Sequence, residues 1–146
     1  MIFLNMEKHV YFKLKLKNLL RGKMMAQYFF PVLNTHASIW VIAMIFFILP
    51  IVNVKKDNKN LAGTFQMILR LFFVFLIVTG LILVYIHNFQ WITVVKALLA
   101  ILLIGIMEIL VSRISKNELT SSQAKVFWGL FAVTLIVVLY LGYIVI

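Results

Sequence analysis

The stretch VFWGLFAVTLIVVLYLGYIVI, residues 126–146, decides the fold. It contains 21 residues and no charge, and a helix needs about 20 apolar residues to cross about 30 Å of hydrocarbon. The rest of the chain has the same character: of its 146 residues, 64% are hydrophobic, 12% are charged and none is cysteine. An ordinary soluble domain is roughly 45–50% apolar and about 25% charged. This composition excludes a soluble enzyme, a disordered chain and a disulfide-stapled secreted domain.

Three further apolar runs precede this stretch. We predict membrane spans at about 36–53, 61–86, 91–112 and 125–146. Helices are expected, because open sheets leave backbone groups unpaired in lipid and the runs do not alternate as barrel strands do. Short polar links make successive helices antiparallel. The expected fold class is therefore an all-α integral membrane protein, a four-transmembrane-helix up-and-down bundle.

The basic residues of the links predict an orientation, because lysine and arginine in short loops favour the cytoplasm. Loops 54–60 and 113–124 carry such residues, whereas the link at 87–90 and the C-terminal end carry none. We therefore predict a multi-pass protein of the bacterial cell membrane, with both basic loops in the cytoplasm and the C-terminus outside. Lys96 lies inside the third span and could snorkel outward.

Residues 1–31 form a basic N-terminal tail ahead of the four-helix domain at 32–146. The net charge of the whole chain is +10, and six of its basic residues lie in this tail. They favour a cytoplasmic N-terminus, against the orientation of the bundle. Either the tail binds anionic lipid as a basic amphipathic segment, or translation begins at Met24 or Met25. We favour the later start, because the period-two pattern at 12–17 fits neither a clean helical face nor a span.

Four short motifs resemble the YisL-type family of small, uncharacterised integral membrane proteins from Gram-positive bacteria. They are His36-Ala37-Ser38-Ile39-Trp40, Met67-Ile68-Leu69-Arg70-Leu71-Phe72, Thr79-Gly80 and Gly105-Ile106-Met107-Glu108. The resemblance covers about the last three-quarters of the chain and leaves the basic tail outside. It implies a membrane fold and brings no known activity.

Arg70 and Glu108 are charges inside the second and third spans, where a charge is rare unless it is paired, faces the bundle interior or touches water. Both lie toward the cytoplasmic ends of their helices. Gly63, Gln66, Ile77 and Val84 share the helical face of Arg70, and Ala97, Ile101, Ile104 and Ser112 share that of Glu108. The small and polar residues among them suit close helix contact. We predict an intramembrane ion pair, more structural than catalytic. The alternative is that both side chains snorkel to the interface.

His36 and His87 lie at the outer ends of adjacent spans, at similar depth. Two such histidines could ligate a haem iron or relay protons. The sequence offers no third ligand or carboxylate to orient them, so we interpret them as interfacial residues that cap the spans. We predict no catalytic residue, no metal site and no bound cofactor, because the acidic residues form no intramembrane carboxylate pair and no catalytic or metal-binding motif is present.

Three functions follow from these features. We expect a non-enzymatic small membrane subunit, scaffold or modulator that contacts the lipid bilayer and either membrane protein partners or a second copy. One alternative is a haem- or other cofactor-binding redox or assembly protein that uses His36 and His87. Another is a subunit of an oligomeric transporter, with the faces of Arg70 and Glu108 as a polar path. No nucleic-acid partner is expected, because a basic tail beside a membrane more often meets lipid headgroups.

Overall fold

The computed structural model describes residues 2–145 of the chain, and the side chains of residues 7–143. This part is all-helical, and its elements are α1 (Ile2–Lys55), α2 (Lys59–Ile86), α3 (Trp91–Ser115) and α4 (Ser121–Val145). Each of the four is long and apolar enough to cross a membrane. The prediction of four helices of spanning length is therefore confirmed.

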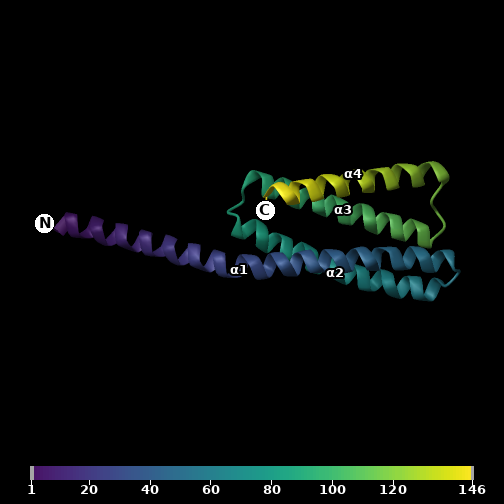
Figure 1. The fold of residues 1–146 in the computed structure, drawn as a ribbon, viewed down its shortest axis with the longest axis horizontal. Helices are drawn as coiled ribbons and strands as arrows, with labels where there is room; N and C mark the ends of the chain where they lie inside the picture. Colours follow the sequence, from purple (N-terminus) through teal and green to yellow (C-terminus); the bar gives the residue numbers. More distant parts are fainter. Residues whose placement is uncertain (1, 146) are drawn as a thin grey trace.

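The helices run alternately in opposite directions, as the short links require (Figure 1). α1 packs along α2, and α3 contacts each of the other three helices. The α1–α2 and α3–α4 links lie at one end of the bundle. The α2–α3 link and the C-terminal end lie at the other (Figure 1). The arrangement thus places both basic links together.

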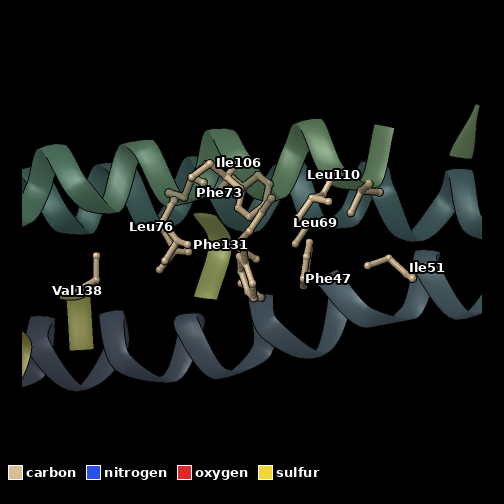
Figure 2. Packing of buried hydrophobic residues seen from close by; sticks show 14 residues of the cluster. Phe47, Ile51, Leu69, Phe73, Leu76, Ile106, Leu110, Phe131 and Val138 are labelled. Carbon is tan, nitrogen blue, oxygen red and sulfur yellow. The ribbon is translucent and has the colours of Figure 1, made fainter. Parts of the chain in front are cut away.

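The apolar core runs along the bundle axis and joins α1, α2 and α3 (Figure 2). Phe47 of α1, Leu69 of α2 and Leu110 of α3 are all at most 1% exposed. α4 adds Phe131, whose ring stacks on that of Phe47 with the centroids 5.1 Å apart. This stack is a direct packing contact between the first and last helices of the bundle.

Three helices end in the same backbone motif. Asp57, Asn88 and Asn117 have positive φ values of 59°, 51° and 55°, and the next amide in each case donates to the carbonyl five residues before it. This is a Schellman cap, which satisfies carbonyls at a helix end. Asp and Asn adopt the left-handed conformation more readily than other non-glycine residues. At the basic links the helices extend beyond the predicted spans, so these links shorten to 56–58 and 116–120, whereas α2 ends at Ile86 and α3 begins at Trp91, at the predicted bounds.

The basic tail is helical and continuous with the first span, since α1 runs from Ile2 to Lys55 without a break. The boundary expected between residues 31 and 32 is therefore not a break in secondary structure. Leucine and lysine are both good helix formers, so an alternating pattern does not prevent a helix. The side chains of residues 7–24 are exposed, and the segment projects beyond the bundle at the α2–α3 link end (Figure 1). The later start of translation stays a prediction.

Candidate functional site

The structure brings Arg70 and Glu108 together across α2 and α3. Arg70 donates to Glu108 Oε1 from Nε at 2.8 Å and from Nη2 at 2.5 Å. Gln66, one turn earlier on α2, lies 3.4 Å from the same oxygen through Nε2. One carboxylate oxygen thus accepts from two side chains of α2, so the pair joins the two helices.

The ion pair lies on the outer side of the bundle. The side chain of Arg70 is 57% exposed and that of Glu108 is 30% exposed. Further along the same faces, Ile77 and Leu81 of α2 and Ile101 of α3 are also partly exposed. We call these five residues the α2–α3 seam. The second carboxylate oxygen, Glu108 Oε2, is buried and has no hydrogen-bond partner among the described residues.

His36 is held by a chain of hydrogen bonds between α1 and α2. The Trp40 indole N–H lies 3.1 Å from His36 Nε2 and can only donate. His36 Nε2 must therefore be unprotonated, so the ring is neutral and carries its proton on Nδ1. This N–H donates to Thr79 Oγ1 at 2.7 Å, and the Thr79 hydroxyl donates to the Phe75 carbonyl at 2.7 Å. Each side-chain donor in this series of hydrogen bonds, on Trp40, His36 and Thr79, therefore has an acceptor.

The close packing at His36 depends on a glycine. A Cβ added at Gly80 would lie 3.5 Å from His36 Cε1, so a methyl group just fits and a larger side chain would displace the ring. Both ring nitrogens of His36 are occupied, and a metal bond to either would break one of the two hydrogen bonds. The structure thus gives His36 an interhelical role beyond the capping expected from the sequence.

His87 is held differently. Its Nδ1 donates to the Leu83 carbonyl at 2.9 Å, and the Phe29 ring packs edge-on against it at 5.1 Å. Its Nε2 makes no hydrogen bond to the described residues, so the two histidines are not equivalent. Among the residues that the structure describes, no three His, Cys, Asp or Glu side chains gather as a metal site.

A cavity at the α2–α3 link end contains polar groups that sequence reasoning undervalued. Both histidines line it, together with Thr93 and Lys96 of α3. The Lys96 side chain reaches toward α4, where its Nζ would lie 3.4 Å from a Cβ added at Gly142, three residues before the end of that helix. The sequence already contained a signal for this polar group, because Thr93 and Lys96 lie three positions apart and so share one face of an apolar helix.

Comparisons with known proteins identify a family whose function is unknown. A family model described as "Protein of unknown function (DUF1516)" matches residues 33–142. The UPF0344 protein of Halalkalibacterium halodurans is 35% identical over 110 residues, which cover 75% of this chain and 88% of that protein. The UPF0344 proteins of Shouchella clausii and Anoxybacillus flavithermus are 36% and 34% identical, and the matches cover 83% and 90% of them.

No solved structure matches this chain. The matches support an uncharacterised family, as the sequence motifs implied, under the names DUF1516 and UPF0344. The YisL-type name stays a resemblance. The matched segment includes His36, Arg70, Lys96 and Glu108, so the ion pair, both histidines and the polar residues of the cavity lie within the part that the family model covers.

Proposed function

Because this chain belongs to the DUF1516 family of Bacillota proteins, which has no known function, we propose its function from its own geometry. The protein is a small, non-enzymatic membrane subunit that binds a partner membrane helix through the α2–α3 seam. The observation that carries this proposal is the exposed ion pair between Arg70 and Glu108.

The proposal begins with the bilayer. Four helices of spanning length, with large apolar side chains exposed on their outer faces, are stable in lipid and not in water, where such surfaces associate. The basic links favour the cytoplasmic side. The proposed orientation therefore has the α1–α2 and α3–α4 links in the cytoplasm, with the α2–α3 link and the C-terminus outside.

The depth of Arg70 argues for a partner over snorkelling. α2 has 28 residues, which is about 42 Å at about 1.5 Å per residue, so roughly 6 Å at each end extends beyond about 30 Å of hydrocarbon. Arg70 lies 11 residues after Lys59, the first residue of α2, so its Cα is about 10 Å inside the hydrocarbon. Its guanidinium is bound to Glu108, which lies seven residues before Ser115 and is therefore about 7 Å inside the hydrocarbon by the same reckoning.

An ion pair at this depth has a net charge of zero but remains strongly polar. The donors of Arg70 that Glu108 does not use would face lipid without partners. Unsatisfied polar groups in hydrocarbon cost several kcal/mol, whereas polar side chains of a neighbouring helix satisfy them. A partner helix with donors and acceptors at the same depth completes the site.

The two-histidine cofactor function has less support. It requires a free ring nitrogen on each histidine, and both nitrogens of His36 already make hydrogen bonds. The seam provides a contact surface without requiring any rearrangement.

Photo-crosslinking in intact cells tests the proposal. A photo-reactive amino acid replaces Met67 or Val74, which lie on α2 one turn before and after Arg70 and are 72% and 56% exposed. The matched control is Leu139 of α4, which is 64% exposed. We expect discrete adducts from both α2 positions and none from α4. The adduct mass tells a second 16.9 kDa copy from another protein. Equal adducts at all three positions, or none at α2, would contradict the proposal.

A further inference from the structure

The cavity at the α2–α3 link end has the size of a narrow ligand. Its volume is about 100 Å³, and residues of all four helices line it. An engineered protein cavity of about 150 Å³ holds a benzene ring. The present cavity is smaller than that one, so it holds a few carbons of one chain and excludes the body of a two-chain lipid. Ile77, Leu81 and Ile101 line it and are partly exposed, so the cavity opens sideways at the α2–α3 seam.

One polar group in this cavity is without a partner. Thr93 is only 7% exposed, and its Oγ1 is buried with no hydrogen-bond partner among the described residues. A buried hydroxyl left unsatisfied costs about 1–3 kcal/mol. A hydroxyl both donates and accepts, so an oxygen atom of a ligand satisfies it.

Lys96 brings a positive charge to this cavity. Lys96 makes no ion pair among the described residues, where the pair formed by Arg70 and Glu108 is the one present. Lys96 is also the only Lys, Arg, Asp or Glu within residues 71–86, 91–107 and 126–143. Its ammonium group is directed toward α4, beside Gly142. A cation within apolar helices is rare without a counter-charge or access to water.

The cavity-facing stripe of α3 changes character along its length. Thr93 and Lys96 lie nearest the α2–α3 link, the small residues Ala97 and Ala100 follow, and larger apolar residues lie deeper. The polar end is thus nearest the bilayer surface, and the apolar part extends toward the bilayer centre. A single-chain amphiphile in a membrane has the same arrangement, with its polar head at the surface and its apolar chain toward the centre.

We propose that this cavity binds a long-chain fatty acid. Lys96 Nζ pairs with one carboxylate oxygen, Thr93 Oγ1 donates to the other, and the first part of the acyl chain lies over Ala97 and Ala100. The rest of the chain leaves between α2 and α3 into the bilayer. The contacts to the carboxylate do not involve the Arg70–Glu108 pair, whereas the acyl chain leaves the bundle past Ile77, Leu81 and Ile101, which also belong to the seam.

The cavity supplies its own probe, because Trp40 lines it. In full-length protein reconstituted in phosphatidylcholine nanodiscs, Trp91 and Trp128 are replaced by Phe so that Trp40 is the sole fluorophore. Dibromostearic acid quenches a nearby indole on contact. We expect saturable quenching by the acid and only weak, linear quenching by its uncharged methyl ester. Saturable quenching of equal strength by acid and ester would overturn the proposal, and so would linear quenching by both.

Two variants test the named contacts. Lys96→Met keeps an unbranched side chain and removes the charge, and Thr93→Val removes the hydroxyl at similar volume. Hydrogen bonds to charged groups are among the stronger ones, so we expect roughly tenfold or greater weakening for Lys96→Met and a smaller loss for Thr93→Val. Lys125→Met, at the other end of the bundle, is the matched control and should bind as the parent does.

Two further outcomes decide the result. If Lys96→Met leaves the apparent affinity for the acid unchanged, Lys96 does not hold the head and the proposal is wrong. If brominated phosphatidylglycerol quenches Trp40 saturably and dibromostearic acid does not, the occupant is a phospholipid and the proposal is again wrong. Should Lys96→Met fail to fold, Thr93→Val and the comparison of acid with ester still decide the question. Quenching is measured on the purified protein without a partner helix, so absence of crosslinks at the seam does not decide this result, and the two proposals fail separately.

Discussion

Replacing Glu108 by Gln should destabilise the bundle through Arg70. The amide keeps the shape of the carboxylate but removes its charge, so Arg70 loses the anion that it contacts at 2.5 and 2.8 Å. Breaking a fully buried pair costs about 3–5 kcal/mol, whereas an exposed pair in water contributes about 0–1 kcal/mol. The Arg70 side chain is 57% exposed, so the buried figure must be reduced. Lipid screens less than water does, and we expect a coupling energy of about 1–2 kcal/mol.

A double-mutant cycle measures this coupling directly. The free energy of unfolding is determined by steric trapping in bicelles for the parent, Glu108→Gln, Arg70→Met and the double variant. Glu118→Gln with Lys125→Met forms the control cycle, since these residues make no ion pair in the described structure, and independent sites add within about 0.3–0.5 kcal/mol. A coupling for Arg70 and Glu108 no larger than in the control cycle would refute the reasoning.

Three further outcomes follow from the fold. Phe47→Ala should lower the free energy of unfolding by about 2–4 kcal/mol, measured by steric trapping, because it removes a buried ring that stacks on α4. Thr79→Val should lower the free energy of unfolding by about 0.6 kcal/mol, the average for a hydrogen bond between membrane helices, and by no more than about 1.7 kcal/mol. It should cost nothing further in a protein that already carries His36→Phe. In intact cells an impermeant maleimide should label a cysteine placed at Asn88, and should label one at Asn117 only after permeabilisation. The chain has no cysteine of its own, and the reversed pattern would invert the proposed orientation.

The helices were predictable from the sequence because membrane spans are limited by length and charge alone. The ends of the helices were less predictable, because hydropathy marks where a helix leaves the bilayer and not where the helix itself ends. Asp57, Asn88 and Asn117 adopt positive φ values and end three helices, and these residue types were a usable signal. The tail is helical despite its alternating pattern because leucine and lysine favour helix regardless of periodicity.

The site was partly predictable for a similar reason. Two opposite charges in otherwise apolar runs were sufficient to expect contact between Arg70 and Glu108, and helical faces indicated the direction. The bond between His36 and Thr79 joins residues 43 positions apart, and their pairing depends on helix register that no local pattern defines. Thr93 and Lys96 were visible as an i, i+3 pair, but only the packed bundle shows that they line a common cavity.

The most direct test of the central claim is whether crosslinking at the seam depends on the ion pair. The yield of the adduct from Val74 is compared in the parent and in Arg70→Met, with Lys125→Met as the control for a lost positive charge. If the seam binds a partner through its polar groups, the adduct falls severalfold in Arg70→Met and persists in the control. An equal yield in all three proteins would contradict the account.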